Sequence, residues 1–211
     1  GEAGSDMLRY TAVTTDLSFT GFVAGTATQN TLSYTVAGTS YTDAYVNLEG
    51  LAGGSGNDLL ALAAGSAAAT LEGGAGHDSL RGASGADTLL GGDGNDMLSG
   101  GGGDDVLDGG DGVDVLDLSG TSDVVNLSLG GNWQGTLAYT GLGTDTVSNF
   151  EGVIGGSAAD SISGSSGDDV IGGGGGNDTL AGGDGNDTLS FDASSSAVTV
   201  NLQTSVSTGE G

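Results

Sequence analysis

Between residues 91 and 117, polar and apolar positions recur with a period of nine. Written in nines, the stretch is GGDGNDMLS, GGGGDDVLD and GGDGVDVLD, with glycine at positions 1 and 4, aspartate at position 6 and leucine at position 8. Glycine permits the backbone conformations of tight turns, and a short segment with one apolar residue is typical of a half-buried strand. The pattern therefore predicts one turn and one short strand in every nine residues.

The same template recurs along much of the chain. Good copies begin at residues 1, 53, 73, 82, 91, 100, 109, 155, 164, 173 and 182, and a degenerate copy with Ala69 at position 6 begins at residue 64. A single short strand is unstable, so we expect two successive units to make one rung and stacked rungs to bury position 8 between two sheets. The expected core residues are Leu60, Leu80, Leu89, Leu98, Leu107, Leu116, Ile162, Ile171, Leu180 and Leu189.

The pattern G-G-x-G-x-D-x-U-x, where U is apolar, resembles the calcium-binding nonapeptide of RTX proteins. The resemblance covers eleven good copies and one poor one, about half of the chain. It implies an all-β fold, a right-handed parallel β-roll in two blocks with β-rich connectors. It also implies a secreted bacterial protein, exported by a one-step type I route to the extracellular space or the cell surface.

The position 6 carboxylates also indicate a metal. Stacking places carboxylates two units apart above one another, where they repel unless a cation lies between them. Calcium accepts six or more oxygen ligands, whereas magnesium requires a smaller octahedron and retains its waters. Carboxylates combined with turn carbonyls therefore predict calcium as the cofactor.

The ligand pattern of the family, carried over to this chain, pairs position 6 aspartates two units apart. The implied pairs, and hence about six Ca²⁺ ions, are Asp58 with Asp78, Asp78 with Asp96, Asp87 with Asp105, Asp96 with Asp114, Asp160 with Asp178, and Asp169 with Asp187. The glycines whose carbonyls would complete the shells are Gly73, Gly76, Gly82, Gly85, Gly91, Gly94, Gly100, Gly103, Gly109, Gly112, Gly173, Gly176, Gly182 and Gly185. Ala69 leaves the site that it would share with Asp87 short of one ligand.

A second, longer period relates two segments outside these units. Residues 43–58, DAYVNLEGLAGGSGND, match residues 145–160, DTVSNFEGVIGGSAAD, without a gap. In both segments a glutamate, Glu49 or Glu151, takes the place of the position 6 aspartate in a degenerate opening unit. We expect Glu151 to share an edge calcium with Asp169, and Glu49 to face Ala69.

The repeats divide the chain into alternating segments. We expect the end of a preceding block at 1–9, a connector at 10–43, a first block at 44–117, a connector at 118–145, a second block at 146–190 and the start of a third connector at 191–211. Alternating apolar and polar residues predict strands at 124–129 and 198–202. Because the chain begins with glycine and ends within a connector, we expect a segment of a longer array.

The composition limits the possible partners. The chain has 28 acidic and 2 basic residues, a formal net charge of -26, 46 glycines and no cysteine. Such a charge repels nucleic acid and attracts cations, and no apolar run is long enough to span a membrane. The absence of cysteine excludes a disulfide framework and thiolate metal ligands.

Nothing in the sequence predicts catalysis. His77 is the only histidine and occupies position 5 of a repeat, where its counterparts are asparagines, so we interpret it as a turn residue. Trp133, the only tryptophan, lies in a connector, where we expect packing rather than sugar stacking. No nucleophile with a matching base is present, and we predict that the chain is not an enzyme.

Two functions follow from this reading. The first is a structural, adhesive or display array that folds on calcium binding after export, with extracellular polysaccharide or another protein surface as a further partner. The alternative is an accessory module of a secreted protease, lipase, alginate epimerase or cytolysin whose active part lies outside this chain. Few large apolar side chains and strong self-repulsion predict that the metal-free chain is unfolded.

Overall fold

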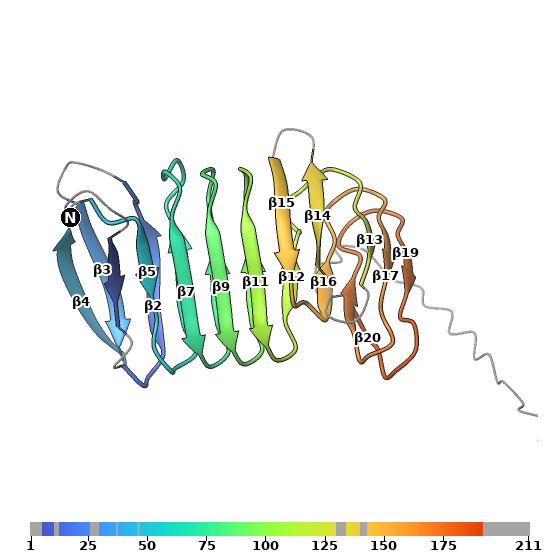
Figure 1. Cartoon of the computed structure of the whole chain (residues 1–211), viewed down its shortest axis with the longest axis horizontal. Helices are drawn as coiled ribbons and strands as arrows, with labels where there is room; N and C mark the ends of the chain where they lie inside the picture. The colour runs from blue at the N-terminus through green and yellow to red at the C-terminus, as the bar shows by residue number, and fades with distance from the viewer. Residues whose placement is uncertain are drawn as a thin grey trace, which may run out of the picture.

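The protein is an elongated stack of short strands (Figure 1). The computed structural model describes residues 6–10, 13–25, 30–36, 38–45, 47–129, 134–139 and 143–191. All regular elements in these residues are strands, so the all-β expectation is confirmed. The described part of the chain contains no helix that could cross a membrane.

The strands form three sheets. A seven-stranded sheet has the order β1 (Met7–Arg9), β5 (Gly50–Ala52), β7 (Thr70–Ala75), β9 (Thr88–Asp93), β11 (Val106–Asp111), β15 (Gly143–Ser148) and β14 (Gln134–Tyr139). A ten-stranded sheet has the order β20 (Thr188–Ser190), β18 (Val170–Gly172), β16 (Gly152–Ile154), β12 (Val115–Asp117), β10 (Met97–Ser99), β8 (Ser79–Arg81), β6 (Leu59–Leu62), β2 (Leu17–Phe22), β3 (Asn30–Val36) and β4 (Thr39–Tyr45). A three-stranded sheet contains β13 (Asn126–Ser128), β17 (Ser161–Ser163) and β19 (Thr179–Ala181).

Successive nonapeptides alternate between two facing sheets, as a parallel β-roll requires. In the ten-stranded sheet, Leu98 lies beside Leu80 on one side and Leu116 on the other, in parallel register. In the seven-stranded sheet, Leu89 lies beside Leu107 in the same way. Neighbours within a sheet are thus two units apart in sequence, and the predicted roll is confirmed.

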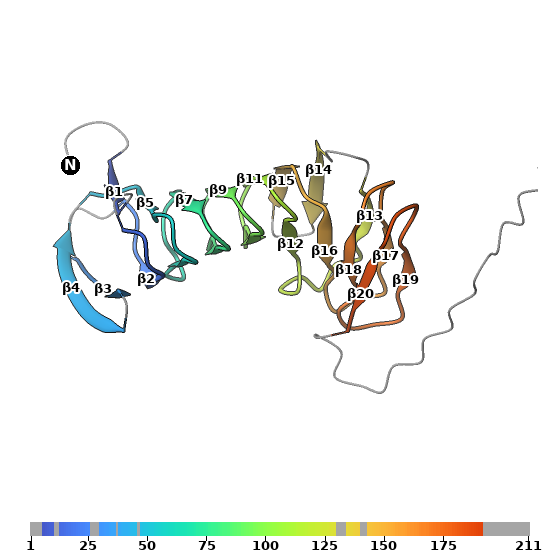
Figure 2. The ribbon, with the colours of Figure 1, turned by 90° about the horizontal axis from the view of Figure 1, so that it is seen from below.

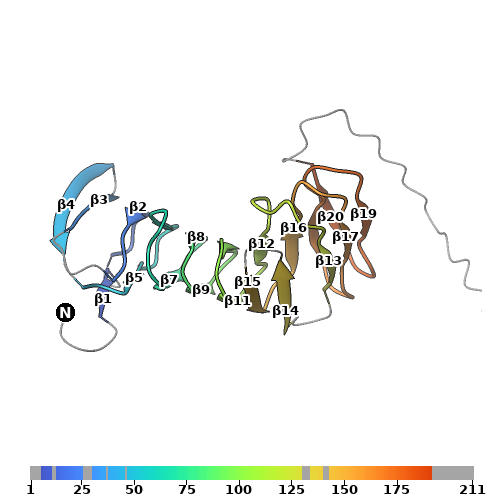
Figure 3. The same ribbon diagram turned by 90° about the horizontal axis from the view of Figure 1, so that it is seen from above.

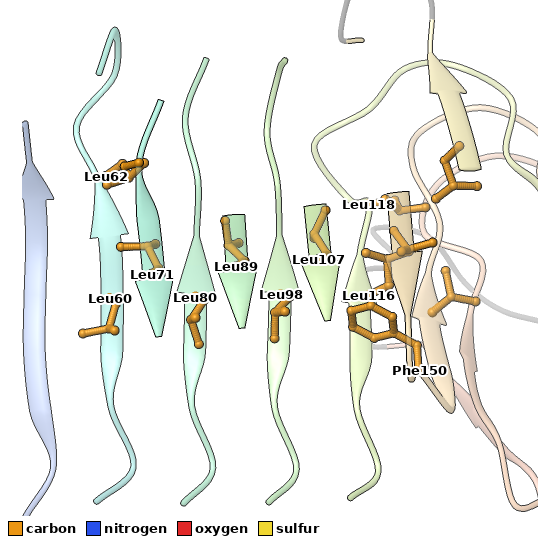
Figure 4. Packing of buried hydrophobic residues seen from close by; sticks show 14 of the residues in the cluster. Leu60, Leu62, Leu71, Leu80, Leu89, Leu98, Leu107, Leu116, Leu118 and Phe150 are labelled. Carbon is orange, nitrogen blue, oxygen red and sulfur yellow. The ribbon is translucent and has the colours of Figure 1, made fainter. Parts of the chain in front are cut away.

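Position 8 side chains form the core between the sheets. Leu60, Leu71, Leu80, Leu89, Leu98, Leu107 and Leu116 follow one another as a ladder (Figure 4), and each is at most 1% exposed. Ile162 and Ile171 continue this core, whereas Leu180 is only partly buried. Leu189, which was expected in the core, is 40% exposed because its strand, β20, ends the ten-stranded sheet in the described part of the chain.

Glycine at position 4 permits the rungs to stack closely. Gly94 has a φ of 128°, a region that side chains with a Cβ rarely adopt. A Cβ at this residue would also collide with the carbonyl of Gly76 in the adjacent turn. The turn geometry therefore depends on glycine for both its dihedral angle and its close backbone contact.

The sheet pairing links segments that the sequence assigned to separate blocks. β12 pairs in parallel with β16, so residues 44–117 and 146–190 share the ten-stranded sheet. β15 pairs with β11 and is a rung of the roll, which places the boundary expected at residue 146 inside a strand. Figures 2 and 3 show these strands succeeding one another along the long axis.

The expected connectors also contribute rungs. β2, within the connector expected at 10–43, pairs in parallel with β6, and β13, within the strand predicted at 124–129, pairs with β17. Each of these two connectors also contributes to an antiparallel hairpin, β3–β4 or β14–β15. The strand predicted at 198–202 and Trp133 lie outside the described residues.

Candidate metal sites

Position 6 aspartates form ladders in two columns of turns, because successive units contribute to alternate columns. The Asp58 N–H donates to Asp78 Oδ1 at 2.7 Å, and the Asp78 N–H donates to Asp96 Oδ1 at 2.7 Å. The same contact, at 2.8 to 3.2 Å, joins Asp96 to Asp114, Asp87 to Asp105, Asp160 to Asp178, and Asp169 to Asp187. The structure thus brings the two members of every expected pair together.

The two glutamates lie in the same ladders. Glu151 Oε2 accepts the Asp114 N–H at 3.0 Å, and its carbonyl accepts the N–H of Val170, the residue after Asp169. Glu151 therefore connects Asp114 of the first repeat segment to Asp169 of the second. Glu49 precedes Ala69 in the other column, because the Glu49 carbonyl accepts the Thr70 N–H at 2.8 Å.

Asp145 is a site residue that the sequence analysis did not identify. It is 5% exposed, and its Oδ1 accepts the Asp105 N–H at 3.0 Å, the same contact that joins the expected pairs. Gly143, Asp145 and Val147 have the spacing of positions 4, 6 and 8 of the repeat, and this spacing could have identified Asp145 from the sequence. The preceding residues do not match the template, and the unit is separated from Asp105 by a long insertion.

The hydrogen bonding of the second carboxylate oxygen, Oδ2, distinguishes two groups among the position 6 aspartates. In one group Oδ2 is buried without a hydrogen-bond partner, and this group comprises Asp78, Asp96, Asp105 and Asp114. Their turns have positive φ at both position 2 and position 4, as at Gly92 and Gly94. We call the turns of these four aspartates open. Burying a charged carboxylate oxygen without a partner costs free energy, so each open turn requires a bound cation or a proton.

In the other group the protein itself satisfies Oδ2. The Gly54 N–H donates to Asp58 Oδ2 at 2.8 Å, and Ala83 donates to Asp87 at 3.0 Å. Gly156 donates to Asp160, and Ser165 to Asp169, in the same way. We call the turns of these four aspartates closed. Each of the four is the first member of an expected pair, and the turn of its partner two units later has positive φ at positions 2 and 4.

Glycine carbonyls lie close to these carboxylates. A Cβ placed on Gly91 would touch both Asp96 Oδ2 and the Gly109 carbonyl, and a Cβ on Gly73 would touch Asp78 Oδ2 and the Gly91 carbonyl. The carbonyl of the position 1 glycine in one turn therefore lies close to the position 6 carboxylate of the turn stacked before it, as Gly109 lies close to Asp96. Position 4 carbonyls differ, since the carbonyls of Gly76, Gly85 and Gly94 face the position 4 glycines of the next turns.

Burial raises the pKa of these carboxyl groups. The pKa of Asp78 and that of Asp114 rise from 3.8 to about 7, and that of Asp145 to about 6, mainly because desolvation disfavours the charged form. Backbone N–H donors lower these values, while neighbouring carboxylates raise them further. The pKa values of Asp58, Asp87, Asp96 and Asp105 are also raised by burial.

These shifts predict how pH affects the metal-free chain. Between pH 3.8 and about 7, folded Asp78 and Asp114 retain protons that the unfolded chain releases. Their contribution to stability is therefore greatest at acid pH and is lost as pH rises through about 7. In chelator, we expect more β-structure by circular dichroism at pH 5 than at pH 8.

Protons and calcium compete for the same oxygens. Protons therefore replace part of the calcium in the folded chain while the unfolded carboxyl groups stay ionised, and the calcium concentration at half-folding is expected to fall as pH is lowered from 8 to 5. Repeating the titration at high salt separates this competition from general charge repulsion, which salt screens. A half-folding concentration that is independent of pH would contradict protonation of the open turns.

The donor set suits a hard oxygen-binding cation. The described residues contain no cluster of three or more histidine, aspartate or glutamate side chains that could enclose a metal. An ion in the turns would thus be held by carboxylate pairs together with backbone carbonyls, which calcium accepts. The unpartnered Oδ2 atoms and the adjoining carbonyl oxygens fit this cation, which would neutralise the buried charge.

His77 belongs to a separate ladder at position 5. Its N–H donates to Asn57 Oδ1 at 2.8 Å, and its Nδ1 accepts the Asn95 N–H at 2.8 Å. Asn95 Oδ1 in turn accepts the Val113 N–H at 3.2 Å. The structure therefore places His77 in a turn position where asparagine serves equally well.

Stacked parallel strands and glycine turns lined by carboxylates define a parallel β-roll of tandem repeats. The family model for the RTX calcium-binding nonapeptide repeat (4 copies) matches residues 63–98, 90–125 and 154–189. The chain thus contains tandem RTX calcium-binding nonapeptide repeats over nearly half of its length, as its sequence implied, and repeats of this kind bind calcium. RTX repeats are typical of secreted bacterial proteins. A comparison with curated proteins found no match.

Proposed function

We propose that this chain is a structural or display array of a secreted bacterial protein that folds when calcium binds after export. The observation that carries the proposal is the set of buried Oδ2 atoms without partners on Asp78, Asp96, Asp105 and Asp114. Each of these carboxylates is stacked on the carboxylates of the adjacent turns in its ladder, and the negative charges repel one another. A cation bound between two of them replaces this repulsion by an attraction that holds adjacent rungs together.

About six calcium ions are proposed, one between the members of each expected pair. The side-chain ligands are Asp58, Asp78, Asp87, Asp96, Asp105, Asp114, Asp160, Asp169, Asp178 and Asp187, with Glu151 at the junction of the repeat segments. Six divalent ions offset about half of the formal net charge of -26, and the remaining charge keeps the array soluble. Position 1 carbonyls adjoin these carboxylates and are the favoured backbone ligands.

Ion binding and folding then form one equilibrium. The core contributes a single apolar residue per unit, and 46 glycines lose much conformational entropy on folding. Calcium that binds only the folded chain shifts the equilibrium toward the roll. In the calcium-poor cytosol the chain remains unfolded and suited to export by the type I route, and it folds in the extracellular medium.

A calcium titration of the metal-free chain tests this proposal. Far-ultraviolet circular dichroism is expected to change cooperatively from coil to β-structure with calcium, and to remain that of a coil at equal concentrations of magnesium. The solution is held at pH 8, which is above the pKa of about 7 of Asp78 and Asp114. Full β-structure in chelator would contradict calcium-driven folding.

A further inference from the structure

The hairpin of β3 and β4 has a counterpart later in the chain. The match of residues 43–58 with 145–160 makes β4 equivalent to β15 and β5 equivalent to β16. Asn47 and Asn149, which are equivalent, both have left-handed backbones, with φ of 49° and 57°. The two hairpins are therefore equivalent structural elements at two places in the roll.

In the later copy the hairpin has a repeat strand on its outer edge. β15 pairs with β14 on one side and, in parallel, with β11 on the other. The Thr146 N–H donates to the Asp105 carbonyl at 2.8 Å, and the Asp105 N–H donates to Asp145 Oδ1 at 3.0 Å. This edge thus joins the hairpin to the nonapeptide unit 100–108.

In the earlier copy no strand among the described residues pairs with the corresponding edge. β4 is the last strand of its sheet in the described part of the chain and lies at the outer end of the molecule (Figure 1). Every residue of β4 except Tyr45 is exposed. Ala44 is equivalent to Thr146, whose N–H donates to the Asp105 carbonyl on the side away from β14, and from this equivalence we infer that the Ala44 N–H points away from β3. A strand edge that lacks a neighbouring strand is a template for another strand.

Asp43 occupies the position of Asp145 on this edge. Its Oδ2 accepts hydrogen bonds from Tyr10 at 3.0 Å and Tyr34 at 2.9 Å, and no contact to its Oδ1 is observed among the described residues. Tyr34 also packs against Phe19, with ring centroids 5.0 Å apart. These contacts hold the carboxylate in place before any partner binds, which lowers the cost of ordering it.

We propose that the outer edge of β4 is a docking site for one further calcium-binding nonapeptide strand, placed directly before residues 1–9 in sequence. The proposal rests on the proposed calcium-dependent folding. The occupant resembles unit 173–181, because the unit that follows it, 182–190, is the counterpart of 1–9. Its aspartate N–H donates to Asp43 Oδ1, and the Ala44 N–H donates to its backbone, as in the β11–β15 contact.

The test extends the full chain at its N-terminus with a copy of residues 155–181. Hydrogen exchange of the Ala44 amide is measured by NMR in saturating calcium, with and without the extension. Docking is expected to slow this exchange at least about tenfold, because an edge amide becomes hydrogen-bonded. An extension whose position 6 aspartates are replaced by alanine is the matched control and is expected to leave the exchange rate unchanged.

Two variants of the extended chain locate the contact. Asp43→Ala is expected to abolish the slowing at Ala44, whereas Asp111→Ala, which removes another exposed carboxylate, is expected to preserve it. Unchanged Ala44 exchange in an extended chain that still folds with calcium would overturn the docking proposal and leave calcium-dependent folding intact. If the Ala44 amide of the unextended chain instead exchanges more slowly as protein concentration rises, the docking proposal is overturned, and a second copy of the chain occupies the edge.

Discussion

Replacing Asp96 with alanine is expected to remove two calcium ions from the folded chain. Asp96 lies between Asp78 and Asp114, is 2% exposed and shares a proposed site with each of them. A site held at a hundredfold excess of calcium over its Kd contributes about 2.7 kcal/mol to folding, so the loss of two sites is a large effect. Calcium stoichiometry by isothermal titration calorimetry and the half-folding concentration by circular dichroism measure it.

Asp93→Ala is the matched control for this variant. Asp93 belongs to the same repeat and carries the same charge, but it is exposed at position 3. We expect its calcium stoichiometry to equal that of the unchanged chain. Equal stoichiometry in the Asp96→Ala chain would instead refute the assignment of the position 6 ladder as the metal site.

Leu98→Ala is expected to reduce the free energy of unfolding by about 2 to 5 kcal/mol in saturating calcium. Leu98 is fully buried between the sheets, in line with Leu80 and Leu116 of the adjacent strands (Figure 4). Each unit contributes a single position 8 side chain to the core, so few neighbouring side chains can relax into the cavity. Urea unfolding followed by circular dichroism measures the change.

Leu189→Ala tests whether this effect arises from burial. Both leucines occupy position 8, but Leu189 is 40% exposed in the terminal strand β20. We therefore expect this variant to lose much less stability than Leu98→Ala. Similar losses for both variants would mean that the ladder contributes through strand propensity rather than through a buried core.

The regular part of the candidate site could be predicted because its geometry is local and repeated. A constant spacing of nine puts Asp78 and Asp96 in adjacent rungs once alternate strands share a sheet, and a single pairing rule then gives the ladder contacts within the regular repeats. The same rule places Leu80 beside Leu98. No long-range information is needed, since each rung contacts only its neighbours.

The irregular part could not be predicted because it depends on pairing across insertions. Asp145 joins Asp105 only because β15 returns to the seven-stranded sheet after the excursion through β13 and β14. Whether a turn is open or closed also depends on the turn stacked before it. Unit 53–61 has the expected glycines, yet the Gly54 N–H binds Asp58 Oδ2, because residues 13–17 rather than another glycine turn precede it in the stack.

The sequence by itself determined the repeat unit, the roll, the leucine ladder and the paired aspartates, because glycine, aspartate and leucine at fixed positions act within and between adjacent rungs. Only the tertiary structure decided that one sheet continues through both repeat segments and that Asp145 completes a ladder. Among the described residues, it also decided which carboxylate oxygens lack a hydrogen-bond partner and that no strand pairs with the outer edge of β4. These features depend on which strands meet across insertions, and no local spacing encodes that pairing.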